Sequence, residues 1–182
     1  MVSQFVSTDK VGLLGDLDFD FPEGTHAIGR LDNLSEGLLI LTTDKKITRL
    51  LFQGIAPHKR VYLVQVKNIV TEETLGRLRD GISIRVKGGQ KYLTAPCEAE
   101  IIESQEKNFP PANGFINYPP FSWLRIGLFE GKFHQVRKMV AAVNHKCVRL
   151  IRVAIEDLSL DNLPPGEVKE IPEDEFYKKL RI

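Results

Sequence analysis

The sequence predicts a single α+β domain over residues 1–182, built on a mixed, largely antiparallel sheet with flanking helices. Short apolar or alternating runs bounded by turn residues recur along the chain and indicate strands. Segments with helical spacing and recognisable caps lie between these runs. With 42% hydrophobic and 27% charged residues, the composition is that of a globular protein long enough to bury a core.

The expected elements alternate along the whole chain. In the first third they are strands at 25–32 and 37–43, a helix at 44–53 with Asp44 as N-cap, and a strand at 60–66. In the middle they are a helix at 71–81 with Thr71 as N-cap and Gly81 as C-cap, a hairpin of 82–86 and 91–104 around Gly88-Gly89, and a Pro-, Asn- and Gly-rich loop at 108–120. The last elements are a strand at 122–131, a helix at 133–145, a strand at 147–155 and a helix at 172–182.

Composition also bounds the compartment. No apolar run approaches the roughly 18 residues that a membrane helix needs, so no membrane is expected as a partner. The N-terminus lacks a basic start followed by an apolar core, so no secretory signal is expected. Cys97 and Cys147 have no CxxC spacing, which argues against a zinc site or a disulfide scaffold. A reducing, cytoplasmic setting and no metal are therefore expected.

The charge distribution is uneven although the net charge is only +1. Residues 125–152 contain seven Lys or Arg and a single acid, Glu130. A basic stretch of this kind is either a solvated face or a surface that meets phosphates. The expected helix at 133–145 carries an apolar stripe of Val136, Met139, Val140 and Val143. It also carries a cationic stripe expected to leave the core, made of His134, Arg137, Lys138, Ala141 and His145.

The segment GRLDNLSEGLLILTTD at 29–44 places Arg30 and Asp32 where a strand is expected to give way to a turn. On an extended segment residues two apart share a face, so both side chains can point the same way. One interpretation is an Asx-turn that Asp32 closes with Asn33, which is common after a strand. The other is a carboxylate beside an arginine in a catalytic site. This segment alone favours the turn.

Four motifs in one order change that balance. GRLDNLSEGLLILTTD is followed by RVYLVQV, EGKFHQVRKM and RLIR. This set resembles the RsuA/RluB/RluE branch of pseudouridine synthases, and its RluE-like members most closely, from about residue 27 to about residue 171. The departures are mild: Ser35 stands where Thr is common, Thr43-Asp44-Lys45 replaces an Asn-Asp-Gly-like turn, and Arg60 replaces a Lys. The N-terminal S4-type RNA-binding domain usual in the branch is not expected here, as in RluE-like members.

The resemblance implies roles for individual residues. Asp32 resembles the catalytic aspartate, Tyr62 the tyrosine that stacks on the target base, and Arg137 the arginine that pairs with the aspartate. Arg30 is a further supporting residue, and Leu150 resembles the apolar residue that closes the pocket. The residues expected to contact RNA are Lys132, His134, Gln135, Lys138, Lys146, Arg149 and Arg152.

The implied activity is isomerisation of a specific uridine in 23S ribosomal RNA to pseudouridine. This reaction oxidises nothing and releases nothing, so no cofactor is expected. The expected partner is a stem-loop of that RNA, and the protein is expected to act as a monomer. Two other functions stay open: a non-catalytic RNA-binding module, and a glycoside or nucleoside hydrolase that uses Asp32 with Glu36.

Overall fold

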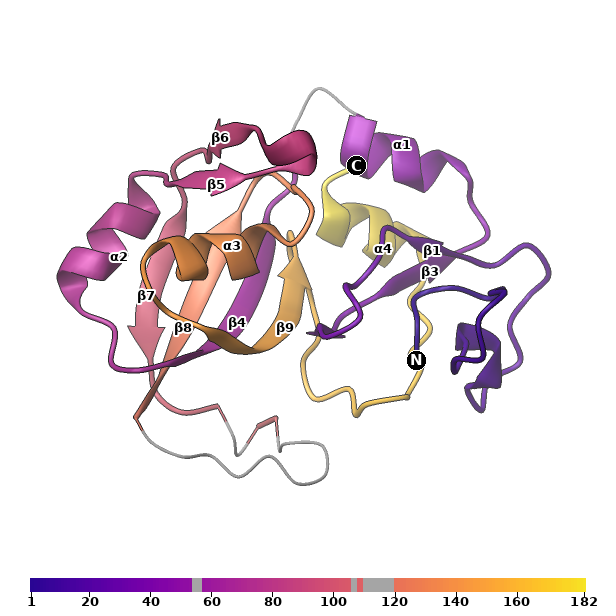
Figure 1. Cartoon of the computed structure of the whole chain (residues 1–182). Coiled ribbons are helices and arrows are strands. Elements are labelled where there is room, and N and C mark those ends of the chain that lie inside the picture. The colour runs from indigo at the N-terminus through magenta and orange to yellow at the C-terminus, as the bar shows by residue number, and fades with distance from the viewer. Residues whose placement is uncertain (54–56, 106–107, 110–119) are drawn as a thin grey trace. The chain divides into compact units, whose positions relative to one another are not determined.

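The computed structural model describes residues 1–53, 57–105, 108–109 and 120–182 (Figure 1). Most of the loop expected at 108–120 lies outside these residues. The chain divides into two compact units. The first consists of residues 1–58 and 152–182, and the second of residues 59–151. The assignment of all 182 residues to a single domain stays a prediction.

The second unit is built on neighbouring strands whose order is β9-β4-β8-β7. Their bounds are β4 Arg60–Lys67, β7 Glu98–Ile102, β8 Phe121–Leu128 and β9 Cys147–Ile155, and the last of these continues into the first unit. β4 and β8 are antiparallel over their full lengths, from Arg60 opposite Leu128 to Lys67 opposite Phe121. β7 is antiparallel to β8 as well. The expected antiparallel sheet is thereby confirmed.

Two helices share one apolar core with these strands. They are α2, Glu72–Arg79, and α3, Gln135–Ala142, which crosses in front of the strands in Figure 1. The apolar stripe expected on α3 is buried throughout: Val136, Met139, Val140 and Val143. Because this stripe faces the core, the polar stripe beside it is directed elsewhere, which brings Arg137 and Lys138 to less buried positions.

Local turn chemistry of the second unit also follows the sequence. The Thr71 hydroxyl accepts a hydrogen bond from Thr74 N at 3.2 Å and caps α2. Asp80 is the C-cap of that helix, and Gly81, expected as the C-cap, follows it with φ 95°. The expected hairpin consists of β5, Ser83–Arg85, and β6, Lys91–Leu93, joined through the short 3-10 helix η2, Lys87–Gly89. The expected strand at 91–104 is not continuous, because residues 94–97 separate β6 from β7, which pairs with β8 instead.

The first unit contains shorter strands and the remaining helices. Its elements are the 3-10 helix η1 Leu14–Asp16, β1 His26–Ile28, β2 Glu36–Gly37, β3 Ile40–Thr42, α1 Lys46–Gln53, β10 Leu158–Ser159 and α4 Glu173–Leu180. β1 and β3 are antiparallel, while β2 and β10 both pair with β9. Asp44 caps α1 as expected, because its Oδ1 accepts from Lys46 N at 2.8 Å.

The strand expected at 37–43 is interrupted after Gly37. That glycine has φ 101°, and a Cβ on it would lie 2.3 Å from the Arg152 carbonyl oxygen. Leu38 N then donates to the same oxygen at 2.8 Å, so this part of the chain follows β9 before β3 begins at Ile40. No helix of the described part of the chain is both long and apolar enough to cross a membrane.

Candidate functional site

The segment before Asp32 is shaped by Gly29. The strand β1 ends at Ile28, earlier than the expected end at 32, because Gly29 has φ 72°. This left-handed conformation suits glycine and turns the chain out of the strand. A Cβ at this position would also lie 3.2 Å from the Phe52 ring. Arg30 and Asp32 therefore lie beyond the end of β1, so the expected strand bounds of 25–32 were wrong. That the two side chains point the same way stays a prediction.

Asp32 begins a tight turn. Ser35 N donates to the Asp32 carbonyl oxygen at 2.7 Å, which closes the turn through the backbone. On the other side, Leu31 N donates to the Ser3 hydroxyl at 3.0 Å. The chain is thus held just before and just after Asp32, whose side chain is half-buried, while Arg30 is exposed. These contacts fix the backbone at Asp32, from which its carboxylate projects.

Tyr62 and Leu150 belong to the core of the second unit. Tyr62 lies on β4 opposite Ile126 and is half-buried against the core cluster. Leu150 lies on β9 and is itself a buried member of that cluster. Both side chains are therefore held by packing, and part of the tyrosine side chain stays accessible.

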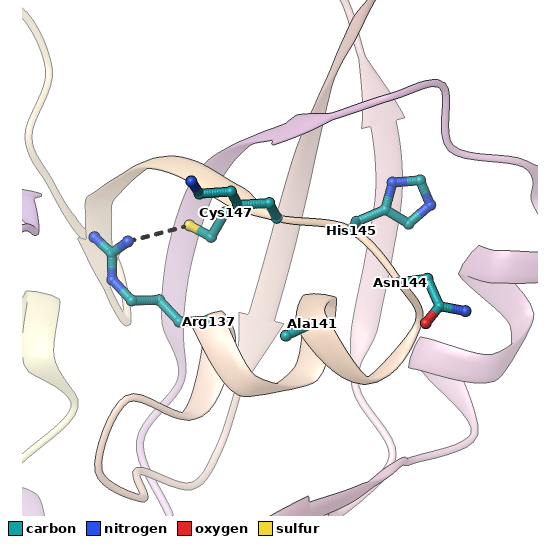
Figure 2. Close-up of a pocket in the computed structure, with 6 residues that line it drawn as sticks. Arg137, Ala141, Asn144, His145 and Cys147 are labelled. Carbon is teal, nitrogen blue, oxygen red and sulfur yellow. Dashed lines mark hydrogen bonds between the residues drawn. The ribbon is translucent and has the colours of Figure 1, made fainter.

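A shallow hollow of about 410 Å³ lies beside α3 and the start of β9 (Figure 2). It is lined by Arg137, Ala141, Asn144, His145, Lys146 and Cys147. In Figure 2 the Arg137 side chain leaves α3 and reaches Cys147, where Nη1 donates to Sγ at 3.5 Å. The Cys147 thiol in turn lies 3.6 Å from the Arg149 carbonyl oxygen and can donate to it.

The electrostatics of this contact are set by Cys147. Burial raises the pKa of the Cys147 thiol to about 11, and the positive charge of Arg137 offsets only part of that effect. At neutral pH the sulfur is therefore an uncharged thiol. It can orient the guanidinium of Arg137 without neutralising its charge.

Gln135 was expected to contact RNA, but the structure gives it a role inside the protein. Its side chain is only 4% exposed. Its Nε2 donates to Glu130 Oε1 at 2.5 Å, and its Oε1 accepts from Lys132 N at 2.8 Å. Tyr92 O–H donates to the other oxygen of Glu130 at 2.5 Å, and this bond raises the pKa of Tyr92. The buried amide thus fixes the turn between β8 and α3.

Arg152 also differs from expectation, because it is only 4% exposed and its Nε donates to the Leu38 carbonyl oxygen at 2.9 Å. It supports the first unit rather than presenting a cation at the surface. The other basic residues expected at RNA are more accessible. Lys132 and Lys146 are exposed, Lys138 is half-buried, and Arg149 is half-buried and donates from Nη1 to the Phe109 carbonyl oxygen.

The two histidines of the expected cationic stripe have different surroundings. His134 precedes α3 with φ 54°, so the helix begins two residues later than the expected 133. Its ring stacks on Phe133 with centroids 3.8 Å apart. His145 is buried, contrary to expectation, and its Nδ1 lies 2.9 Å from the Lys67 carbonyl oxygen.

Two residues of this region have structural features that were not predicted from the sequence. Glu130 is the lone acid among seven bases, and that isolation signals a structural partner for nearby polar groups. Phe133 is a large apolar ring placed between Lys132 and His134, and it is 71% exposed. Among the described residues, no group of three or more His, Cys, Asp or Glu side chains is placed to hold a metal ion.

The sequence pattern of the RNA pseudouridylate synthase family matches residues 16–142 of the chain. The chain belongs to this family. It is therefore an RNA pseudouridine synthase, an isomerase that converts uridine in RNA to pseudouridine. The match extends across β1, the Asp32 turn, β4 and all of α3.

Similar proteins cover nearly the whole of this pseudouridine synthase. A ribosomal large subunit pseudouridine synthase E of Vibrio vulnificus is 39% identical over 173 residues, which are 93% of this chain and 70% of the relative. A protein of the same name from Xanthomonas axonopodis pv. citri is 36% identical over 91% of this chain and 85% of its own length. A crystal structure of a pseudouridylate synthase matches 98% of the chain and 68% of its own, with TM-score 0.74 and 29% identity.

Proposed function

We propose that this pseudouridine synthase modifies a specific uridine in 23S ribosomal RNA of the large subunit. The observation that carries the proposal is the relationship to proteins named ribosomal large subunit pseudouridine synthase E, at 36–39% identity over more than nine-tenths of the chain. We further propose that the uridine lies in a stem-loop, that the protein acts as a monomer, and that it works in the cytoplasm.

In this proposal Asp32 supplies the carboxylate. The reaction breaks the N1–C1′ bond of the uridine, rotates the base and joins its C5 to C1′. A carboxylate can serve as a nucleophile at C1′ or as a base at the sugar, and both roles need it ionised. The backbone turn at Asp32 and the bond from Leu31 to Ser3 support a fixed position for this group.

Arg137 is the proposed cationic partner of that carboxylate. A guanidinium stays charged at any physiological pH and presents several donors in one plane. The neutral Cys147 thiol holds one Arg137 nitrogen in place without adding a negative charge. This contact supports a role for Arg137 as a positioned positive charge.

Tyr62 and Leu150 are the proposed walls for the target base, with Arg30 as a further supporting residue. A uridine inside a helix is out of reach and has to be flipped out, which costs roughly a few kcal/mol. Stacking on the Tyr62 ring would recover roughly 1–3 kcal/mol of that cost. The half-buried tyrosine and the core position of Leu150 support preorganised walls, since packing holds both side chains.

The cations proposed to bind phosphates are the accessible ones: Lys132, Lys138, Lys146 and Arg149, with His134 beside them. Such contacts fix position on the RNA but carry little sequence information. Bases that are splayed out near the target are where a protein reads RNA sequence. We therefore expect bases flanking the uridine to matter more for selection than the sequence of the paired stem.

Mapping of pseudouridine in transcribed 23S ribosomal RNA before and after treatment with the protein tests this function. The expected result is one new pseudouridine and no free uracil. Modification spread over many uridines would contradict the proposed specificity. Release of uracil would indicate a hydrolase, and binding without modification would indicate a non-catalytic RNA-binding module. A matching test compares ribosomal RNA from cells with and without the gene.

A further inference from the structure

An exposed aromatic ring stands on the basic segment of the second unit. Phe133 is 71% exposed and lies in the turn between β8 and α3. An apolar ring this accessible gains little from burial in the folded chain. Isolated exposed apolar residues are common, so the exposure alone indicates no role. The surroundings of the ring do indicate one.

The turn that carries Phe133 is fixed by hydrogen bonds on both sides. Before the ring, Lys132 N donates to the buried Gln135 side chain, which donates in turn to Glu130. Glu130 also accepts from Ala95 N at 3.1 Å. After the ring, His134 takes the left-handed conformation that begins α3. A side chain on so constrained a turn loses less conformational entropy when it binds a partner.

Cationic and aromatic groups surround the ring. Lys138 Nζ lies 5.3 Å from the Phe133 ring centroid, and the His134 ring stacks on Phe133 with an interplanar angle of 19°. Lys132 Nζ lies 4.6 Å from the centre of the Tyr92 ring. Single-stranded nucleic acids are bound by this combination, in which aromatic rings stack on bases and nearby cations meet the backbone.

We propose that Phe133 is a stacking platform for an unpaired nucleobase of the RNA substrate, other than the uridine that is isomerised. The inference rests on the proposed function in one respect, that a structured RNA occupies the basic segment. Residues 125–152 contain seven Lys or Arg and one acidic residue, and this excess of positive charge favours a polyanion over a protein as the occupant. The His134 ring covers one face of the phenyl ring, so the flat nucleobase would stack on the other face.

Stacking and phosphate contacts differ in their salt dependence, and this difference separates the roles of Phe133 and the lysines. Phe133→Ala is expected to raise the Kd for RNA about 5- to 150-fold, the equivalent of about 1–3 kcal/mol. The slope of log Kd against log salt should stay as in the wild type, since no charge is lost. Phe133→Trp should keep most of the affinity. Lys146→Gln should weaken binding and lower the slope by about 1.

The probe is a hairpin RNA with an all-uridine loop that carries one 2-aminopurine, because base stacking tolerates any base. Wild-type protein should change the fluorescence of this probe, and Phe133→Ala should lose most of the change at saturating protein. Phe129→Ala is the matched control, since Phe129 is another accessible phenylalanine of the same segment, at 47% exposure. The Phe129→Ala protein should bind the hairpin with wild-type affinity and cause the same change in probe fluorescence. Thermal unfolding of each variant shows that the fold is kept.

If Phe133→Ala binds the hairpin with wild-type affinity and gives the wild-type fluorescence change, the inference is overturned. A protein would then be the partner that contacts this ring. An equal loss for Phe129→Ala, or a changed salt slope for Phe133→Ala, would overturn it as well. These outcomes are separate from those of the proposed function. If the wild-type protein binds the hairpin through Phe133 but forms no pseudouridine in 23S ribosomal RNA, only the proposed function is contradicted, and the inference on Phe133 stands.

Discussion

Arg137 donates a hydrogen bond to the Cys147 sulfur at 3.5 Å, and this contact joins the helix α3 to the start of β9. The sulfur is held as a thiol because burial raises its pKa to about 11. A serine hydroxyl in the same place would lie closer to the backbone than this sulfur does, because a C–O bond is shorter than a C–S bond. The charge of the arginine is therefore oriented by a group that is neutral over the physiological pH range.

The raised pKa predicts a loss of stability at high pH. In the unfolded chain Cys147 ionises near its usual 9.0, but in the folded chain it ionises near 11. Between these values the unfolded state binds fewer protons than the folded state. The contribution of the Cys147 thiol to the free energy of unfolding, fully present below pH 9, is therefore lost as the pH rises through 11. The loss is at most about 2.7 kcal/mol, at 1.36 kcal/mol per pKa unit. Urea unfolding from about pH 8 to about pH 11 under reducing conditions measures it.

The control for this titration is Cys147→Ser, which removes the thiol and leaves every other ionising group. The wild type should lose more stability than the variant over this pH range. Cys97→Ser gives an independent comparison, since burial, followed by Glu130 and Glu98, raises the pKa of Cys97 to about 11 too. Parallel stability curves for wild type and Cys147→Ser would contradict the neutral thiol.

Arg137 is expected to serve the reaction more than the binding of RNA. Arg137→Met should slow turnover at saturating RNA far more than Lys138→Met does. Lys138→Met should mainly weaken binding and flatten its salt dependence, as expected for a phosphate contact. The measurement is kcat together with Kd at several salt concentrations. Equal effects of the two substitutions on both quantities would count against the role proposed for Arg137.

Asp32→Asn is expected to abolish isomerisation while RNA affinity stays within about tenfold of the wild type. The substitution keeps the shape of the side chain and removes its charge, so it acts on the chemistry. Asp20→Asn, an exposed carboxylate of the same unit, is the matched control and should keep full turnover. Turnover of Asp32→Asn above about 1% of the wild type would remove Asp32 from the catalytic role.

Much of the fold follows from local sequence signals, because periodicity and caps act over a few residues. The stripe from Val136 to Val143 and the strand at 147–155 lie where the sequence places them. Several errors in element bounds occur at left-handed residues: Gly29 follows the end of β1, Gly37 ends β2, and His134 precedes the start of α3. Hydrophobic periodicity carries no information about such a residue, and only a few per cent of residues other than glycine take a positive φ, so the 54° of His134 could not be foreseen from its residue type.

The candidate site was less predictable than the fold. A resemblance assigns residue types to positions, but whether a polar side chain is used inside the protein depends on its neighbours in space. Gln135 and Arg152 stand in the basic segment of the sequence, yet their partners are Glu130 and the Leu38 carbonyl oxygen. Arg152 and Leu38 are 114 residues apart, so no local pattern could have paired them.

Tyr62 is expected to act through the face of its ring. Tyr62→Phe keeps the ring and should keep much of the activity. Tyr62→Ala should lose stacking and also leave a gap against the core cluster, so turnover should fall further and stability should fall with it. Turnover and thermal unfolding of both variants are the measurements. If Tyr62→Phe is as inactive as Tyr62→Ala while its stability is unchanged, the hydroxyl takes part in the reaction.

Gly37 is expected to be indispensable to the first unit, because its backbone lies against β9. A Cβ here would lie 2.3 Å from the Arg152 carbonyl oxygen, and φ is 101°, so Gly37→Ala meets both a clash and a strained backbone. We expect it to destabilise the protein by more than about 2 kcal/mol. Gly76→Ala is the matched control: Gly76 lies in α2 with nothing within 4 Å of its missing Cβ, and alanine there should stabilise by about 0.5–1 kcal/mol. Urea unfolding of both variants measures the two effects, and a Gly37→Ala protein as stable as the wild type would show that β2 does not pack on β9 as described.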